Sequence, residues 1–298
     1  MNILFCGGSR QQGIHIINSL LELGIELTVL NRHGQKEKMS HGKLNWVYGD
    51  RTSAETMRNA ISGKHFDIVV DTSAVSGQDV INLLDNVKTD YYIQISSNAV
   101  YNPLSINIAP ESFDPKSFDP KSFDPKRATF TTGNADYQLG KRNAEKYAFE
   151  YDIPALILRM PYICGLNDKS GRLKWFVEKI LKYDPFEFNV DYVCRRFAVA
   201  HESEAARFIM HAIENKLVGI FNCASDGIMS VDKIIGYIEY KTGKYARFKF
   251  GAENHCHYNN VPEHSLSTDS AKATGHSFLN IEDWLYDTLD FYIDAAKW

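Results

Sequence analysis

The sequence predicts an α/β fold in which helices cover both faces of a parallel sheet. An apolar run opens the chain at residues 2–6 and leads straight into glycines, and short apolar runs then alternate with helix-like stretches over two thirds of the length. This alternation is typical of βαβ units, which build a doubly wound parallel sheet. With 44% hydrophobic and 23% charged residues, the composition is that of a globular protein with a large core.

The expected elements follow from hydrophobic periodicity and from the position of turn-forming residues. Strands are expected at 2–6, 26–30, 44–48, 67–71, 91–96, 155–159 and 220–223. Helices are expected at 12–23, 54–61, 78–87, 134–151, 173–182, 202–215, 231–242 and 281–296.

The chain length of 298 residues lies near the upper limit for one hydrophobic core. We expect a larger domain formed by residues 1–165, to which residues 195–225 return. Residues 166–194 and 226–298 are expected to form a smaller C-terminal lobe.

The net charge of −4 and the pI of about 6.2 give no overall electrostatic signature of nucleic-acid or membrane binding. No apolar stretch is long enough to span a bilayer, and the N-terminus reads as a first strand without a leader. Five scattered cysteines without a Cys-x-x-Cys spacing favour a reducing compartment. We therefore expect a soluble, cytoplasmic protein with no membrane and no nucleic-acid partner.

The stretch His255-Cys256-His257 contains metal-ligating residue types. Neighbouring residues on an extended chain point to opposite sides, and no other cysteine or histidine cluster completes a ligand set. We therefore expect no metal.

The sequence Ser-Phe-Asp-Pro-Lys occurs three times in tandem over residues 112–126. A proline at every fifth position excludes a regular helix or central strand, which predicts a surface loop of repeated turns. A neutral expansion of this loop is favoured because loops absorb insertions at little cost. A lid formed by the phenylalanines is the alternative.

A glycine-rich loop follows the first strand and leads into the first helix. Gly7, Gly8 and Gly13 would let the backbone turn tightly and approach a pyrophosphate, which then rests on the helix N-terminus. Ser9 and Arg10 lie inside this loop, where Arg10 replaces a glycine of the usual pattern. The loop predicts dinucleotide binding by a Rossmann domain.

The end of the second strand bears on the choice of cofactor. NAD-specific domains usually carry a carboxylate there for the ribose 2′-hydroxyl, whereas this chain has Asn31 and Arg32. Arg32, with Arg10, can pair with the 2′-phosphate of NADP, since a guanidinium suits phosphate geometry. NADP is therefore the preferred cofactor, with NAD as the alternative.

Tyr137 and Lys141 form a Tyr-x-x-x-Lys pair on a predicted helix, where this spacing places both side chains on one face. Oxidation of an alcohol by a nicotinamide needs a base, and a phenol serves only when a nearby cation favours its deprotonation. Lys141 would supply that cation. Residues 96–101, at the end of the preceding strand, provide the hydroxyl of Ser97.

In this order the motifs resemble those of the extended, atypical short-chain dehydrogenases/reductases of the NAD-dependent epimerase/dehydratase family. The matching segments are residues 7–13, Asp50, 97–101, Tyr137 with Lys141, 158–165, 196–202 and 219–222. The resemblance implies that Ser97 orients the substrate, Tyr137 is the acid/base and Lys141 also binds the ribose. It places Asp50 at the adenine, and the C-terminal lobe around the substrate.

The resemblance also implies that Ala74 and Pro161 contact the cofactor, and that Asn98 and Arg196, with Ser97, contact a sugar or sugar nucleotide. Asn98 and Ala99 stand where 4,6-dehydratases of the family carry an acid pair. An epimerase or a simple reductase is therefore favoured over a dehydratase. The family likeness further suggests a homodimer joined through helices that include 134–151.

A non-catalytic cofactor sensor or RNA-binding protein is the alternative function, because a fold does not fix an activity. The arginine in the glycine loop is shared with the chloroplast stem-loop RNA-binding proteins. The complete set of Ser97, Tyr137 and Lys141 favours the enzyme, and the acidic balance disfavours RNA binding.

Overall fold

The computed structural model describes residues 1–8, 11–33, 43–129, 135–168, 170–188, 194–250, 257–258 and 261–296. The chain forms two compact units. The first contains residues 1–102, 110–160 and 205–223, and the second contains 103–109, 161–204 and 224–298.

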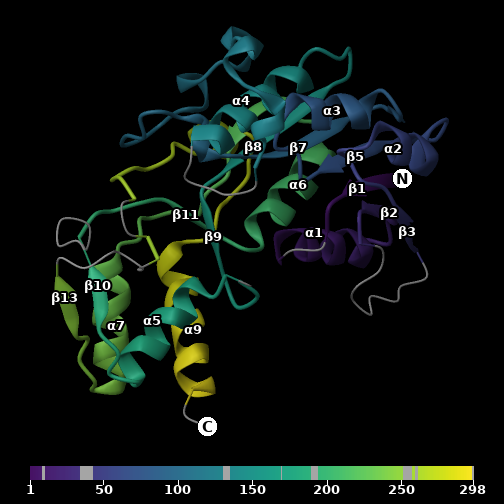
Figure 1. Cartoon of the computed structure of the whole chain (residues 1–298). Helices are drawn as coiled ribbons and strands as arrows, with labels where there is room; N and C mark the ends of the chain where they lie inside the picture. Colours follow the sequence, from purple (N-terminus) through teal and green to yellow (C-terminus); the bar gives the residue numbers. More distant parts are fainter. Residues whose placement is uncertain are drawn as a thin grey trace. The chain divides into compact units, whose positions relative to one another are not determined.

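A seven-stranded parallel sheet is the centre of the first unit (Figure 1). Its spatial order is β12-β8-β7-β5-β1-β2-β3. The bounds are β1 Asn2–Cys6, β2 Glu26–Asn31, β3 Leu44–Tyr48, β5 Ile68–Asp71, β7 Tyr92–Ser97, β8 Ala155–Met160 and β12 Gly219–Asn222. Two short strands, β4 His65–Phe66 and β6 Lys88–Thr89, pair separately.

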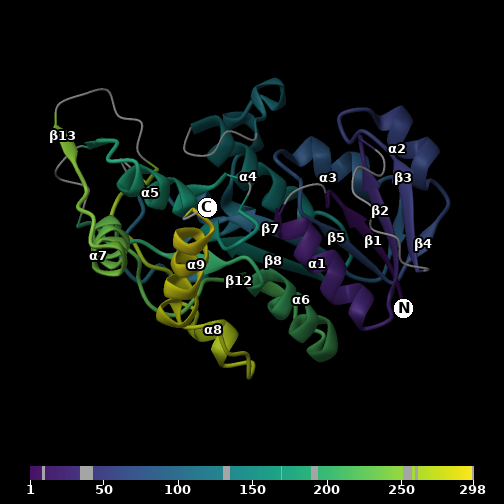
Figure 2. The ribbon, with the colours of Figure 1, turned by 90° about the horizontal axis from the view of Figure 1, so that it is seen from below.

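Helices cover both faces of this sheet (Figures 1 and 2). One face carries α2 Ala54–Ile61, α3 Gly77–Leu84 and α4 Ala135–Ala148, whose apolar residues share a core with Leu4, Val69 and Ile157. The other face carries α1 Gln11–Glu22 and α6 Glu204–Asn215. The predicted doubly wound Rossmann fold is confirmed.

The strand order reverses at β1, which pairs with β2 on one side and with β5 on the other. In open parallel sheets, ligands bind at the carboxyl ends of the strands where the order reverses. The loop that follows Cys6 therefore occupies the expected ligand position of this fold.

The second unit is built mainly from helices. The helices α5 Arg172–Leu181, α7 Val231–Thr242 and α9 Ile281–Ala295 contact one another, and a short helix α8 spans Asp269–Lys272. Two parallel strand pairs accompany them, β9 Tyr162–Cys164 with β11 Val199–His201, and β10 Phe186–Phe188 with β13 Phe248–Phe250. The sequence did not predict these strands, which at three residues each are too short for a period to show.

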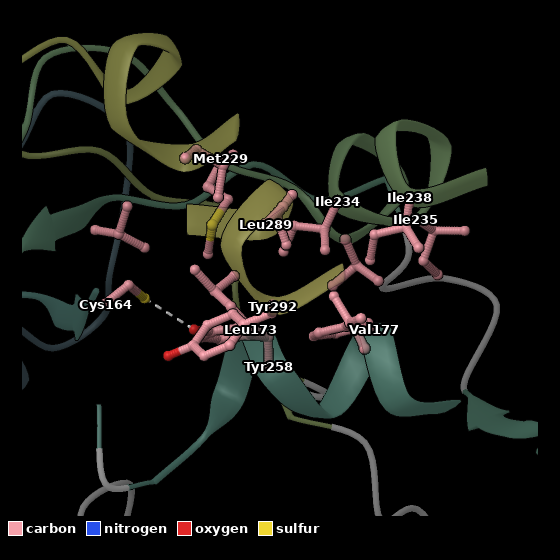
Figure 3. Close-up of a cluster of buried hydrophobic side chains, with 14 of the residues drawn as sticks. Cys164, Leu173, Val177, Met229, Ile234, Ile235, Ile238, Tyr258, Leu289 and Tyr292 are labelled. Atoms are coloured by element: carbon pink, nitrogen blue, oxygen red, sulfur yellow. Dashed lines mark hydrogen bonds between the residues drawn. The ribbon is translucent and has the colours of Figure 1, made fainter. Parts of the chain in front are cut away.

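A single apolar cluster holds the second unit together (Figure 3). Leu173 and Val177 of α5 lie beside Leu289 of α9 in this cluster. Cys164 and Tyr258 meet at its edge, where the thiol sulfur lies 3.0 Å from the phenol oxygen. Burial raises the pKa of the Cys164 thiol to about 12, so this cysteine is a packing residue and not a reactive thiol.

The tandem repeats of residues 112–126 form successive 3₁₀ turns, as the sequence predicted for repeated turns. Their bounds are η3 Pro115–Ser117, η4 Pro120–Ser122 and η5 Pro125–Arg127, preceded by η2 Pro110–Ser112. Among the described residues, no helix combines the length and the apolar character that a bilayer crossing requires.

Candidate functional site

The glycine loop owes its shape to close backbone packing. Gly7 and Gly8 have φ values of +115° and +81°, a region that favours glycine. A Cβ on Gly7 would lie 2.3 Å from Oγ1 of Thr72, and a Cβ on Gly13 would lie 2.6 Å from Cα of Gly8. All three glycines are therefore required for the first turn of α1 to close on the end of β1. Ser9 and Arg10, predicted to bind the cofactor, lie outside the described residues.

The ends of β2 and β3 place Asn31, Arg32 and Asp50 at the same edge of the sheet, because the two strands are parallel and Asn31 pairs with Tyr48. Arg32 is exposed, and its Nε donates to the ring of His33 at 3.3 Å. The Oδ1 atom of Asp50 accepts hydrogen bonds from the amide and hydroxyl of Thr52 at 3.0 and 2.8 Å. These bonds hold the pKa of Asp50 below its ordinary value, and Arg32 adds to this effect.

The segment after β5 carries Ala74, the position expected to lie under the cofactor. Asp71 at the end of β5 orders this segment, since its Oδ1 accepts from the amides of Ser73 at 2.9 Å and Ala74 at 3.2 Å. The other carboxylate oxygen of Asp71 pairs with Arg51 at 2.9 Å and accepts from the hydroxyl of Tyr92 at 3.1 Å. Asp71 is fully buried.

Sequence patterns did not indicate Arg51 and Asp71. Neither residue belongs to a recognised spacing, and a separation of 20 positions along the chain hides the ion pair. A buried polar residue at the end of an otherwise apolar strand, as in Ile68–Asp71, is the signal that could have drawn attention to Asp71.

Helix α4 carries both predicted catalytic residues. Lys141 is 5% exposed, and its Nζ donates to the carbonyl oxygens of Ala74 at 2.7 Å and Ile95 at 3.1 Å. The same Nζ lies 6.0 Å from the ring centroid of Tyr137. The structure thus places Lys141 in contact with Ala74 and on the same helix face as Tyr137. The roles of the three residues stay predictions.

Ser97 is the last residue of β7 and begins a 3₁₀ turn, η1 Asn98–Val100. Its Oγ accepts from the amide of Ala99 at 3.2 Å. The chain beyond it is bound to α4, since Nε of Arg142 donates to the carbonyl of Val100 at 2.7 Å. Asn98, predicted to contact substrate, lies buried in this turn.

A buried ion pair joins α4 to β8 and was also not predicted from the sequence. Glu145 of α4 and Arg159 of β8 are both fully buried, and Arg159 Nη2 lies 2.6 Å from Glu145 Oε2. The other carboxylate oxygen of Glu145 accepts a hydrogen bond from the hydroxyl group of Ser96. Arg159 further donates to the hydroxyl of Tyr101 at 3.1 Å.

Further hydrogen bonds extend this network. Arg159 donates to the carbonyls of Pro110 at 2.6 Å and Phe113 at 2.9 Å, and the Tyr101 hydroxyl donates to Asn222 at 2.6 Å. Glu145 follows Lys141 by four residues, so the helical spacing that identified Tyr137 and Lys141 could have extended to it.

Pro161 and Arg196 belong to the second unit. Arg196 has an exposed side chain, and its Nε pairs with Glu263 at 2.8 Å. Their predicted contacts with cofactor and substrate remain predictions.

One group of three potential metal ligands occurs in the described part of the chain, formed by His65, Asp67 and Asp90. They precede β5 and β7 in the chain, which places them at the amino edge of the sheet, opposite to the glycine loop. Asp67 already accepts the amide of Asn2 at 2.7 Å, and His65 pairs with Asp90 at 3.0 Å. Of the three histidine and cysteine residues considered from the sequence, 255 and 256 lie outside the described residues.

The described residues combine a doubly wound parallel sheet, glycines at the point where the strand order reverses, and a tyrosine and a lysine on one face of α4. Residues 3–82 match the model of the NAD-dependent epimerase/dehydratase family, which confirms the resemblance seen in the sequence over the segment that contains the glycine loop, Asp50 and Ala74. A comparison with curated protein sequences finds no match.

Solved structures share the fold over nearly the whole chain. A putative epimerase from Burkholderia cenocepacia has a TM-score of 0.74 at 16% identity and covers 98% of each chain. The UDP-glucuronic acid 4-epimerase of Bacillus cereus in complex with NAD has a TM-score of 0.70 at 17% identity, covering 99% of each chain. A dTDP-glucose 4,6-dehydratase from Bacillus anthracis in complex with NAD has 0.70 at 15%, covering 100% of this chain and 98% of the other.

The family model matches residues 3–82, and the solved structures share the fold over nearly the whole chain. At these identities the solved structures show the fold alone.

Proposed function

We propose that this protein is an NAD(P)-dependent epimerase or reductase that acts on a sugar nucleotide. The observation that carries the proposal is the contact of Lys141 with Ala74, which joins the catalytic helix to the segment expected to lie under the cofactor. Tyr137 lies on the same helix face, so a proton-transferring group and a cation stand at the edge of the sheet where the strand order reverses.

The residues of the glycine loop suit a dinucleotide. A Cβ on Gly7, Gly8 or Gly13 would fall within 2.3 to 2.6 Å of neighbouring protein atoms, so only glycine allows the chain to pack this closely before the start of α1. The N-terminus of a helix placed in this way can receive a pyrophosphate. Asp50 remains ionised at neutral pH and is available to accept hydrogen bonds from the adenine end. We assign Ala74 and Pro161 to the neighbourhood of the nicotinamide half.

When bound, the nicotinamide supplies the hydride acceptor or donor. Tyr137 would take the proton from the substrate hydroxyl during oxidation and return it during reduction, and Ser97 would hold that hydroxyl by a hydrogen bond. Lys141 would stabilise the deprotonated phenol and donate to the ribose, exchanging part of its bonding to the carbonyls of Ala74 and Ile95. Proton transfer of this kind contributes about 10²–10⁴-fold to rate.

We further propose a preference for NADP, carried by Arg32 at the end of β2 and by Arg10. The exposed guanidinium of Arg32 faces solvent beside Asp50, and no carboxylate stands at Asn31 to receive a ribose 2′-hydroxyl. Two of the solved structures named above are complexes with NAD, so the experiment has to compare NAD with NADP.

The substrate class rests on the relatives and on Arg196. One solved structure with this fold contains UDP-glucuronic acid and NAD. Arg196 is an exposed arginine of the second unit, suited to a diphosphate, and Asn98 is assigned to the sugar. Because Asn98 and Ala99 replace an acid pair, water elimination is not part of the proposal. A cytoplasmic homodimer is the expected working form.

The test is direct. The purified protein is titrated with NADPH and NADH by nicotinamide fluorescence, and then incubated with UDP-glucose or UDP-glucuronic acid while products are separated by chromatography. Tight cofactor binding with conversion of either sugar nucleotide supports the proposal. Absence of binding to both nicotinamides would refute it.

A further inference from the structure

The three Ser-Phe-Asp-Pro-Lys repeats have no part in the function proposed so far, although they have a uniform structure. Asp114, Asp119 and Asp124 each accept a hydrogen bond at 3.0 Å from the amide of the lysine two residues later. The intervening proline opens the 3₁₀ turn, and it cannot donate a hydrogen bond of its own. The copies are therefore equivalent locally, and differ only in what their side chains touch.

In the second and third copies the phenylalanine is the buried residue, whereas in the first copy Phe113 is half-buried and Pro115 is buried. The aspartate and the lysine of every copy are exposed. Phe118 is 8% exposed and Phe123 is 6% exposed. The ring centroid of Phe113 lies 4.8 Å from the guanidinium carbon of Arg142 on helix α4. The burial of both rings means that the second and third copies pack against the protein and do not extend freely into solvent.

The repeats run along α4 in the opposite direction to the helix. The first copy lies near its C-terminal half, where Nζ of Lys146 donates to the carbonyl of Lys116 at 3.4 Å. The segment ends near the first turn of the helix, where Arg127 pairs with Asp136 at 2.9 Å. The third copy therefore lies next to the helical turn that carries the catalytic residues.

Phe123 of this third copy meets α4 at Gly140. A Cβ on Gly140 would lie 2.2 Å from the carbonyl oxygen of Val75 and 3.2 Å from Cζ of Phe123. Gly140 thus lets the helix rest directly on the backbone that follows Ala74, and the ring of Phe123 packs at that junction. The next residue is Lys141, which donates to Ala74.

We propose that Phe123 is a positioning residue for Lys141 and Tyr137, because its ring holds α4 against the backbone at Val75. This inference rests on the proposed function. The middle copy, with Phe118, then serves as a spacer that brings the third copy to Gly140. Catalytic geometry is sensitive to such support, since a displacement of about 1 Å can cost about 10²-fold in rate.

The chain offers a matched control for this proposal. Phe118→Ala removes the same side chain, at nearly the same burial, from a copy with the same local structure. Phe123→Ala and Phe118→Ala are therefore compared in the full-length protein. Phe123→Leu retains apolar volume at the junction and is the rescue variant, which also keeps the test open if Phe123→Ala folds poorly.

Three measurements separate positioning from simple stabilisation. Amide hydrogen exchange reports the opening of residues 135–141, titration with NADPH and NADH reports cofactor affinity, and the pH dependence of turnover reports the acid/base group. We expect Phe123→Ala to raise exchange in residues 135–141, to weaken NADPH binding by about tenfold and to move the pH profile. Phe118→Ala should lower the melting temperature while leaving these three readouts at the level of the unmodified protein, and Phe123→Leu should restore them in large part.

Equal effects of the two alanine variants on all three readouts would overturn the proposal, because both rings would then only stabilise the fold. Unchanged exchange in Phe123→Ala would overturn it as well. A chain that binds neither NADPH nor NADH defeats the proposed function, and the exchange comparison still decides whether Phe123 holds the helix.

Discussion

The ammonium of Lys141 donates to the carbonyl oxygen of Ala74 at 2.7 Å. This contact joins helix α4 to the segment that follows β5, two parts of the chain separated by 67 residues. Lys141 is almost fully buried, and a buried ammonium needs hydrogen-bond acceptors to offset its lost hydration. The backbone carbonyls of Ala74 and Ile95 accept hydrogen bonds from this ammonium and hold the lysine side chain beside Tyr137.

Replacing Lys141 with methionine tests this arrangement. Lys141→Met should weaken NADPH binding and abolish most of the turnover, because the variant loses both the ribose donor and the cation next to Tyr137. Fluorescence titration and product analysis measure the two effects. Lys64→Met, which removes an exposed lysine on the same unit, is the control. Cofactor affinity unchanged in Lys141→Met would contradict the ribose-binding role.

Cofactor preference depends on Arg32. The unmodified protein should bind NADPH more tightly than NADH. Arg32→Ala should reduce this preference, because it removes a charge-assisted contact with the 2′-phosphate that is worth about 1.5–3 kcal/mol. Arg58→Ala, at an exposed arginine of α2, controls for a general loss of positive charge. Equal dissociation constants of the unmodified protein for NADPH and NADH would contradict the proposed NADP preference.

Sequence patterns were sufficient for the sheet, because its strands are mostly apolar runs of four to six residues, and helix-like stretches separate most of them. The position of Lys141 beside Tyr137 also followed from local spacing along one helix. The Arg51–Asp71 and Glu145–Arg159 ion pairs could not be predicted in this way. Each joins residues that are far apart in the sequence, and local periodicity carries no information about such contacts. The docking of Phe123 on Gly140 is likewise a non-local contact.

The Glu145–Arg159 pair should be important for stability. Both side chains are fully buried, so Glu145→Gln leaves the Arg159 charge without its partner in a dry environment. Loss of one partner of a buried ion pair costs about 3–5 kcal/mol. Urea unfolding measures the change, and Glu150→Gln, at an exposed position just beyond the same helix, is the control. A loss below about 1 kcal/mol would show that solvent reaches Arg159.

Asp50 gives a pH-dependent prediction. Its pKa is lower in the folded protein, mainly because the Thr52 amide and hydroxyl donate to the carboxylate. A carboxylate with a depressed folded pKa stabilises the fold above its unfolded pKa, near 3.9, and this contribution is lost as the pH falls through the lower folded value. Asp50→Asn should therefore destabilise the protein at pH 7, by about 1 kcal/mol.

The difference between Asp50→Asn and the unmodified protein should shrink as the pH is lowered below about 4. Denaturant unfolding at a series of pH values follows it. A difference that stays constant from neutral to acidic pH would mean that the carboxylate charge at Asp50 has no part in the effect.

Tyr137 bears most directly on the central claim that this chain catalyses hydride transfer with Tyr/Lys assistance. Tyr137→Phe removes only the hydroxyl, so the variant should bind NADPH as the unmodified protein does. Turnover of the sugar nucleotide found active in the unmodified protein should fall by about 10²–10⁴-fold, measured as product formed per enzyme at saturating substrate. Full turnover by Tyr137→Phe would contradict the assignment of Tyr137 as the acid/base and, with it, the proposed mechanism.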